Sequence, residues 1–266
     1  MKPFDKSLGI VGFGAFGCFM AAHLAPWFRV TAWDSADIPA TALPENVTAS
    51  PTIAEVAACD IVVFAVPWKS LADAAAMAAP HMKPEALALD VTSVKRGPAA
   101  LLPKALPAHV DILCTHPLFG PQSGKNGISG LRMALCPVRI EKDRYYRVCD
   151  FLTDRLGLLV FKTTPDKHDR EMAKVQAVTH FVSRALKEIG LEPSCMATRA
   201  YEKLQEFSSI VLSDSWDLFL TIQNGNPYAA ETRRSLQREM DKLEAMLRAV
   251  DGPVREPMPP PYAAAW

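Results

Sequence analysis

The segment Ser7-Leu-Gly-Ile-Val-Gly-Phe-Gly-Ala-Phe-Gly17 runs from a short apolar stretch into three closely spaced glycines. The apolar stretch predicts a buried strand, and residues 16–24 predict the helix that follows it. Between them lies a loop with GxGxxG spacing, made of Gly12, Phe13, Gly14, Ala15, Phe16 and Gly17. In this setting the first glycine permits a tight turn, the second lets backbone approach a pyrophosphate, and the third lets helix and strand pack closely. The segment therefore predicts the dinucleotide-binding loop of a Rossmann-type domain.

The residues after the second predicted strand, 29–33, indicate which dinucleotide binds. Asp34 ends that strand, and a carboxylate there accepts hydrogen bonds from ribose hydroxyls but repels a 2′-phosphate. Ser35 follows it, and the run Ser35-Ala-Asp37 holds no arginine for such a phosphate. We therefore expect NAD rather than NADP, the alternative being a solvated turn aspartate with no cofactor role. Three further residues, at the end of the third strand, should line the same crevice: Ala65, Val66 and Pro67.

The order of apolar segments predicts the fold class. Near-continuous apolar strands alternate with helical stretches, which is typical of a parallel sheet covered on both faces. Strands are expected at 7–11, 29–33, 60–66, 86–90 and 110–115, with edge strands at 133–140 and 158–161. Long helices are expected afterwards at 166–189, 198–223 and 227–250, the last beginning with a proline at its first helical position. The prediction is an α/β protein with a Rossmann-type domain (1–163), an all-α dimerisation domain (164–251) and a Pro/Ala-rich tail (252–266).

Composition narrows the class of partner. The 266 residues carry 29 basic and 29 acidic side chains, so neither nucleic acid nor an anionic membrane is expected as a partner. The six cysteines lie apart with no CxxC pair and no metal-binding spacing, which indicates a reducing compartment, the cytoplasm, and no metal. The apolar stretch 8–28 imitates a signal peptide or a membrane span, but its glycines, His23 and Pro26 argue against both.

A second stretch, Asp111-Ile-Leu-Cys-Thr-His116 followed by Pro117-Leu-Phe-Gly-Pro-Gln-Ser-Gly-Lys125, predicts the chemistry. Loops at the carboxyl ends of parallel strands converge on one crevice, and a histidine there can take or hold a proton. The alternative is that His116 only caps its strand. Ser93, after the strand at 86–90, should lie at the same sheet edge, either orienting the imidazole or serving as an ordinary loop serine.

The helical half offers two further candidates. Gln176 and His180 lie four residues apart and share one helix face, as ligand-binding residues or as a satisfied interhelical pair. Asp214 has aliphatic neighbours on its predicted helix, and an acid is costly to bury there without a cation. That cation is either a lysine or arginine of the chain or part of a substrate.

Together these motifs resemble the TyrA dehydrogenases, in particular the plant-type arogenate dehydrogenases. The resemblance rests on Asp-Val-Thr-Ser93-Val-Lys95, the His116 stretch, His168-Asp, Gln176-Ala-Val-Thr-His180 and Ser213-Asp-Ser-Trp-Asp217. It implies a Rossmann domain joined to a helical dimerisation domain, and oxidative decarboxylation of arogenate or prephenate. It also implies the following roles: His116 as catalytic histidine, Ser93 as its hydroxyl partner, Gln122, Ser123, Gln176 and His180 in the substrate pocket, Lys125 facing a carboxylate, and Asp214 favouring arogenate.

Two departures bear on substrate and cofactor. Plant enzymes of this type usually carry Ser-Arg after the second strand and use NADP, whereas Trp33-Asp-Ser35 favours NAD here. Many bacterial prephenate enzymes place an arginine in the second helix of the helical domain, and Tyr201-Glu-Lys-Leu-Gln-Glu-Phe207 has none. We therefore expect NAD-dependent oxidation of arogenate by a homodimer. Prephenate dehydrogenase activity and a non-catalytic dinucleotide sensor are the alternatives.

Overall fold

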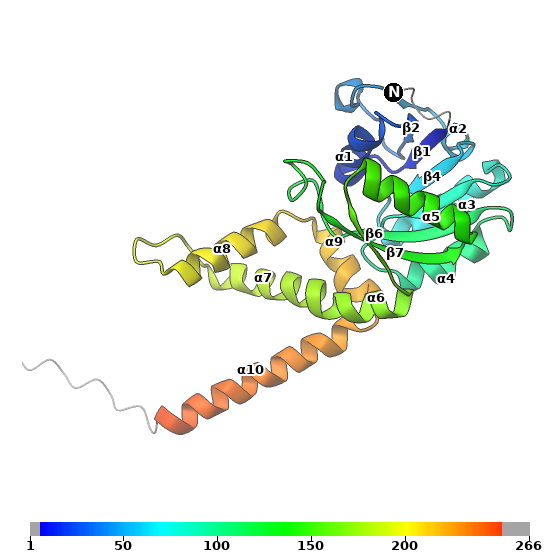
Figure 1. Ribbon diagram of the computed structural model, residues 1–266. Coiled ribbons are helices and arrows are strands. Elements are labelled where there is room, and N and C mark those ends of the chain that lie inside the picture. The colour runs from blue at the N-terminus through cyan, green and yellow to red at the C-terminus, as the bar shows by residue number, and fades with distance from the viewer. Residues whose placement is uncertain (1–5, 252–266) are drawn as a thin grey trace, which may run out of the picture.

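The structure, a computed structural model, describes residues 6–251 and is built around one eight-stranded sheet (Figure 1). The strands lie in the order β3-β2-β1-β4-β5-β6-β7-β8. Their bounds are β1 (Ser7–Val11), β2 (Arg29–Trp33), β3 (Val47–Ala49), β4 (Ile61–Phe64), β5 (Leu87–Asp90), β6 (Asp111–Pro117), β7 (Arg132–Arg139) and β8 (Leu159–Lys162). The predicted strands are therefore confirmed, and β3 is an edge strand that the prediction missed.

The topology places the strand ends where the motifs require them. From β3 to β6 every neighbouring pair is parallel, and β1 pairs with β2 on one side and β4 on the other. The carboxyl ends of β1, β4, β5 and β6 consequently share one edge, and the order reverses at β1, where open sheets bind ligands. The expected parallel sheet is confirmed, with one antiparallel pair, β6 and β7, among the described strands. The loop between them has no crossover helix, so β7 starts at the edge where β6 ends.

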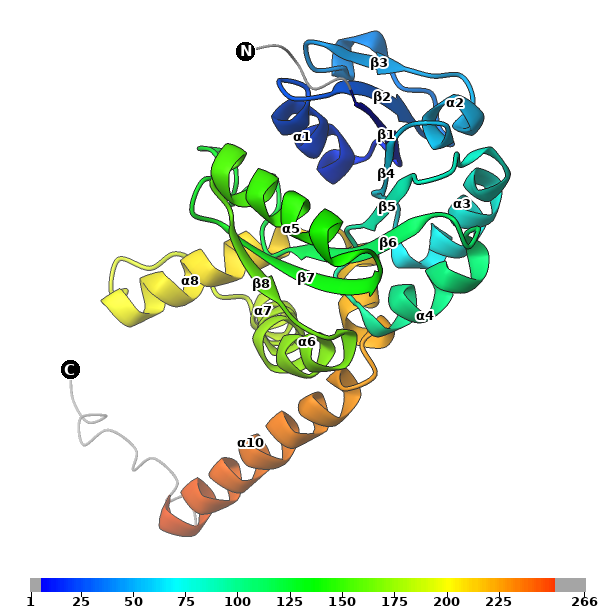
Figure 2. The same ribbon diagram turned by 45° about the vertical axis from the view of Figure 1, so that its right-hand side comes forward.

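Helices cover both faces of the sheet (Figure 2). One face carries α1 (Ala15–Leu24) and α5 (Lys142–Asp150). The other carries α2 (Ile53–Ala57), α3 (Leu71–Ala78) and α4 (Arg96–Ala105). Their apolar side chains pack with the strands into a two-sided core in which residues such as Ile10, Phe64 and Ile112 are fully buried. Burial of this apolar surface fixes the strands and thereby the loops at their carboxyl ends.

The helical half follows β8 and contains α6 (Pro165–Met172), α7 (Val178–Ile189), α8 (Arg199–Leu212), α9 (Trp216–Leu220) and α10 (Ala229–Asp251). The prediction of unbroken helices at 166–189 and 198–223 is wrong in detail. A π-helical turn at Ala173–Ala177 separates α6 from α7, and a turn separates α8 from α9 because Ser215 caps a new helix by accepting from Leu218 N. Pro227 likewise precedes α10 by two residues instead of occupying its first position.

The two halves pack together along α4, α6 and α9. A Cβ on Gly225 would lie 3.2 Å from Trp68 Cδ1, and Lys69 forms an ion pair with Asp217 at 2.9 Å. The predicted boundary between 1–163 and 164–251 falls in the loop between β8 and α6 and stays a prediction, and the predicted tail lies outside the described residues. Across residues 6–251, no helix combines the length and apolar character needed to cross a membrane.

Candidate active site

The three loop glycines occupy positions that other residues could not fill or would obstruct. Gly12 has a φ of +97°, and a Cβ there would lie 2.8 Å from the Ala65 carbonyl oxygen. A Cβ on Gly17 would lie 2.2 Å from the Gly12 oxygen, so α1 packs directly on the turn. Around Gly14, in contrast, no atom of residues 6–251 lies within 4 Å of a built Cβ. That open position before the amino terminus of α1 suits the approach of a phosphate.

Asp34 lies beside this loop and shapes it. Its carboxylate accepts hydrogen bonds from Phe13 N at 2.6 Å, Ala36 N at 3.0 Å and the Ser35 hydroxyl at 3.3 Å. Gly12 N donates to Trp33 O at 2.8 Å, which joins the loop to β2. A carboxylate oxygen has two acceptor positions, so Asp34 can hold the loop and also accept a ribose hydroxyl. The residues present therefore fit an adenosine dinucleotide.

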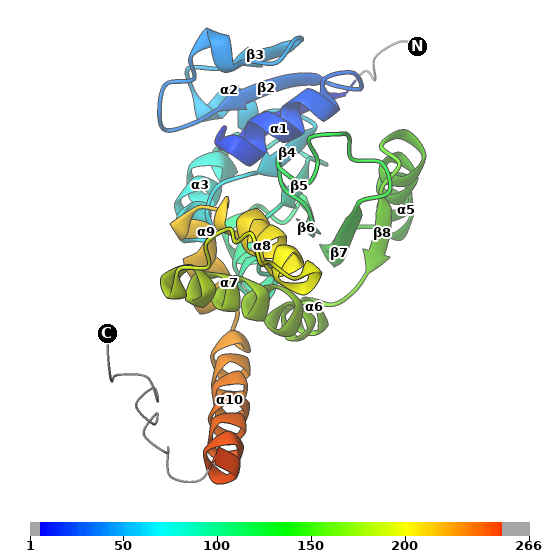
Figure 3. The ribbon, with the colours of Figure 1, turned by 90° about the vertical axis from the view of Figure 1, so that its left-hand side faces the viewer.

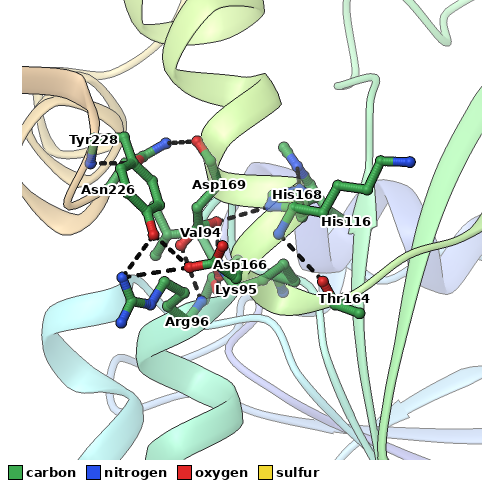
Figure 4. A network of polar contacts seen from close by, with 12 residues as sticks. Val94, Lys95, Arg96, His116, Thr164, Asp166, His168, Asp169, Asn226 and Tyr228 are labelled. Atoms are coloured by element: carbon green, nitrogen blue, oxygen red, sulfur yellow. Dashed lines mark hydrogen bonds and ion pairs between the residues drawn. The ribbon is translucent and has the colours of Figure 1, made fainter. Parts of the chain in front are cut away.

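At the same sheet edge, His116 belongs to a buried chain of three polar side chains (Figure 4). His116 Nδ1 lies 2.9 Å from His168 Nε2, and His168 Nδ1 lies 2.8 Å from Asp169 Oδ1. All three residues are at most 3% exposed. The end of strand β6 in the sheet domain and helix α6 in the helical half thus supply one continuous relay.

The relay determines which nitrogen of His116 carries its proton. A carboxylate only accepts hydrogen bonds, so His168 Nδ1 must donate to Asp169 and His168 Nε2 must accept. His116 Nδ1 then donates to His168, which leaves His116 Nε2 with a bare lone pair. No hydrogen bond to that nitrogen occurs within residues 6–251. His116 is therefore presented as a base through Nε2.

Asp169 is held rigidly behind the two histidines. It accepts from the backbone N–H groups of Lys95 at 2.8 Å and Arg96 at 3.0 Å, at the amino terminus of α4. Asn226 donates to its backbone carbonyl at 2.7 Å. Two backbone donors at the start of α4 thereby gain a partner from the helical half. The same contacts that dock the two halves also aim the relay.

A buried ion pair lies beneath His116. The Lys95 ammonium donates to the Asp90 carboxylate and to the Thr115 carbonyl, and neither charged side chain is exposed. Burial lowers the pKa of His116 well below 6.5, and the neighbouring His168 and the positive charge of Lys95 lower it further. The imidazole is therefore neutral at pH 7, as a base must be before it accepts a proton.

The sequence prediction for Ser93 needs correction. Ser93 is half-buried in the loop after β5, as expected, but His168 and not Ser93 holds the His116 imidazole. Within the described chain, Ser93 makes no hydrogen bond to that ring. The sequence marks this part of the relay with the adjacent pair His168-Asp169, but the burial of that pair and its contact with His116 become visible only in the fold.

The loop after β6 brings three predicted residues over the glycine-loop side of the sheet. Ser123 Oγ accepts from Gly120 N at 2.9 Å, so this hydroxyl stabilises its own turn. Gln122 and Lys125 are exposed on the same loop. Gly124 packs on α1, where a Cβ would lie 2.4 Å from Phe19 Cζ. The loop is therefore anchored on the helix that follows the dinucleotide turn.

Gln176 and His180 follow His168 by about two and three helical turns, in the π-helical turn and at the start of α7. The π-helical turn that presents Gln176 adds a residue to the helix, a feature often found at functional sites. Three buried polar atoms gathered here have no partner within residues 6–251: Gln176 Oε1, Ser183 Oγ and Arg184 Nε. Buried polar groups normally have a hydrogen-bond partner, which at this face would be ordered water or a ligand.

Asp214 lies in the turn between α8 and α9, so its predicted place on a continuous helix is wrong. Its carboxylate is 3.6 Å from His180 Nε2, and its backbone carbonyl accepts from Arg184 at 3.0 Å. Burial raises the pKa of Asp214 and lowers that of His180 to about 4, while Arg184 opposes the first shift and adds to the second. The cation of the chain near Asp214 is therefore Arg184. The Asp214 side chain is nevertheless 37% exposed and can accept a second cation.

Comparisons with known proteins agree with this architecture. The family described as prephenate dehydrogenase, nucleotide-binding domain, matches residues 39–155, and the one described as TYRAAT1-like, C-terminal domain, matches residues 185–255. Arogenate dehydrogenase 2, chloroplastic, of Arabidopsis thaliana is 38% identical over 171 residues, which is 63% of this chain and 48% of that protein. The chain thus spans about half the length of this curated relative.

Two solved structures share the fold over nearly the whole chain. Synechocystis arogenate dehydrogenase has a TM-score of 0.67 and 17% identity, covering 93% of this chain and 94% of its own. Prephenate dehydrogenase from A. aeolicus has a TM-score of 0.72 and 16% identity, covering 94% of each chain.

The fold and the site define a dinucleotide-binding protein that pairs a Rossmann-type domain with a helical one, with a buried histidine relay where they meet. Within that class, residues 39–155 match the nucleotide-binding domain of prephenate dehydrogenases, and the chain is similar in sequence and fold to arogenate and prephenate dehydrogenases of the TyrA type.

Proposed function

We propose that the chain catalyses the oxidative decarboxylation of L-arogenate to L-tyrosine with NAD. The observation that carries this proposal is the His116–His168–Asp169 relay, which presents a neutral imidazole as a base at the sheet edge shared with the glycine loop. A binding protein without turnover would need the glycine loop but not a buried, tautomer-fixed histidine. The relay therefore favours an enzyme over a dinucleotide sensor.

NAD, when bound, supplies the hydride acceptor. Its pyrophosphate would be held by the loop from Gly12 to Gly17, and Asp34 would accept its ribose hydroxyls. Ala65, Val66 and Pro67 follow β4 beside Gly12, where they would line the same crevice. We infer NAD in preference to NADP because Asp34 would repel a 2′-phosphate and Ser35-Ala-Asp37 offers no arginine.

His116 would handle the single proton of the reaction. Its Nε2 accepts the proton of the substrate C4 hydroxyl as a hydride leaves C4, and the resulting imidazolium is stabilised through His168 by Asp169. The C1–carboxylate bond then breaks to release CO2, its electron pair makes the ring aromatic, and the proton returns from Nε2 to the phenolic oxygen. Positioned general-base catalysis of this kind contributes about 10²–10⁴-fold in rate.

The remaining predicted residues would position the substrate. Ser93, at the same edge, would bind the C4 hydroxyl, and Gln122, Ser123 and Lys125 would close over the ring and its carboxylate. Gln176 and His180 would bind the side-chain end, where buried polar atoms lack partners. Asp214 would pair with the ammonium of arogenate, a group that prephenate replaces with a keto oxygen. Because of this carboxylate we propose arogenate, rather than prephenate, as the substrate.

We further propose that two copies associate through the helical half. Along α10 the apolar residues recur at intervals of four and three, the repeat of a coiled-coil seam: Leu236, Met240, Leu243, Leu247 and Val250. The last four are at least half exposed, and Figure 1 shows α10 extending away from the sheet domain. A second copy of the chain would cover this seam. Free cysteines suit the cytoplasm, although the plant relatives are named chloroplastic.

The test is turnover by the purified chain. The chain is incubated with NAD and either arogenate or prephenate, and NADH is followed by absorbance while tyrosine and 4-hydroxyphenylpyruvate are measured by chromatography. We expect NADH and tyrosine in equal amounts from arogenate. Turnover of prephenate alone would reassign the substrate, and turnover of neither acid with NAD or NADP would refute the enzymatic proposal.

A further inference from the structure

The sheet face that carries α1 and α5 also encloses a large cavity. The two helices are set apart along this face (Figure 3), and a cavity of about 280 Å³ lies between them. Its walls are side chains of the central strands, such as Ile61, Val63 and Leu89, together with aromatic rings from the helices. A partly open apolar hollow of this size between packed elements is the usual setting of a small-molecule binding site.

The charged groups around the cavity all have one sign. Lys6, Arg144 and Arg147 line it, together with His23, and no carboxylate does so. Arg144 is committed to Asp111 at 2.8 Å. Lys6 and Arg147 have no acidic partner within residues 6–251. An apolar interior with uncommitted cations at its border is complementary to an amphipathic anion.

Two of the cations, Lys6 and Arg144, lie at the end of the cavity remote from the relay, and Arg147 follows Arg144 by about one turn of α5. Lys6 directly precedes β1, and Arg144 pairs with the first residue of β6, so both belong to the amino-terminal edge of the sheet. The opposite end is formed by Thr115, Pro117 and Phe119, next to His116. An elongated molecule with its anionic head at the amino-terminal edge would therefore extend its apolar body toward the active-site loop.

One side chain connects the cavity wall to that loop. Phe19 of α1 lines the cavity, and its ring centroid lies 6.4 Å from that of Phe119 in an edge-to-face contact. It also supports Gly124, whose Cβ position lies 2.4 Å from Phe19 Cζ. Because Phe19 has the cavity on one side and the loop on the other, a molecule in the cavity would restrict the loop.

We propose that this cavity is a binding site for an amphipathic carboxylate, with its head at Lys6 and Arg147 and its apolar body between α1 and α5. The site borders the dinucleotide loop at Phe16 and the relay at Thr115 and Pro117, but its lining includes no glycine of that loop and no residue of the relay. Occupancy orders the loop that follows β6. Neither statement depends on which acid the enzyme oxidises.

The test uses decanoate, below its micellar concentration, and calorimetric titration of the full chain. We expect saturable binding of one decanoate per chain and weaker binding of uncharged decanol. Arg147→Glu should weaken decanoate binding about threefold to tenfold, since it loses one ion pair and adds a repulsion. Lys142→Glu, the same charge change on α5 outside the cavity, should leave binding unchanged.

A cavity-filling variant locates the ligand. Leu89→Phe should weaken decanoate binding at least about tenfold, and Met20→Phe provides the same test from α1 if the first variant does not fold. Hydrogen exchange of residues 117–125 should slow when decanoate binds. Absence of saturable binding, or equal binding to the wild type and to a folded cavity-filling variant, would overturn the proposal. Binding without slower exchange would overturn its effect on the loop.

Discussion

Replacing His168 with phenylalanine tests the relay without touching the base itself. The change keeps a ring of similar size but removes the acceptor 2.9 Å from His116 Nδ1. A hydrogen bond to a group that becomes charged is worth about 1.5–3 kcal/mol. Since each 1.36 kcal/mol is tenfold in rate, kcat should fall by about 10- to 150-fold. His168→Gln keeps an acceptor at this place and should lose distinctly less.

We expect the substitution of His168 to lower kcat and not to change KM, because His168 positions the base and does not touch the substrate. The KM values for arogenate and NAD should stay within about twofold of the wild type, measured from initial rates of NADH formation. The phenylalanine variant also leaves buried partners unpaired, so its unfolding in urea must be measured and should show a loss of about 1–3 kcal/mol. His109→Phe, a histidine at the opposite sheet edge, is the control and should not change kcat. A folded His168→Phe protein with kcat within twofold of wild type would refute the relay.

Four further predictions follow from the same geometry. His116→Asn should lower kcat at least about 10²-fold with NAD affinity unchanged by fluorescence titration, and near-normal turnover would remove the base from the mechanism. Asp214→Asn should shift relative kcat/KM from arogenate toward prephenate by about tenfold or less, because this carboxylate is 37% exposed, and an unchanged ratio would contradict its role. Burial lowers the pKa of His180 from 6.5 to about 4, so the unfolded chain binds more protons. The contribution of His180 to the free energy of unfolding should therefore be complete above pH 6.5 and fall by about 3 kcal/mol toward pH 4. Urea unfolding of His180→Gln should show a smaller loss of stability over the same pH range. Leu243→Lys on α10 should give a monomer in sedimentation, whereas an unchanged dimer would exclude the seam.

Much of the sheet and the cofactor loop could be predicted from the sequence, because local signals determine both. The strands β1 and β2 match their predicted bounds, since each is a buried apolar run ended by a turn. Gly12 and Asp34 carry a motif whose spacing already implies the strand–turn–helix geometry. The strand β3 was missed because its three residues, Val47–Ala49, are too few to show a periodic pattern.

The relay could not be predicted, because it depends on how two distant elements dock. His116 and His168 are separated by more than fifty residues, and only the docking of α6 on α4 brings their rings together. The helix interruptions were missed for another reason. Neither the π-helical turn at Ala173–Ala177 nor the cap at Ser215 is marked by a glycine or a proline, so no residue in the sequence signals a break at either place.

Nitrogen-15 NMR of the histidine rings tests the central claim most directly. In protein labelled on histidine and assigned with His116→Asn, the account predicts that His116 is neutral at pH 6.5, protonated on Nδ1 and bare on Nε2. In His168→Phe protein the two neutral tautomers should both become populated. A His116 ring that is charged at pH 6.5, or that carries its proton on Nε2, would contradict the account.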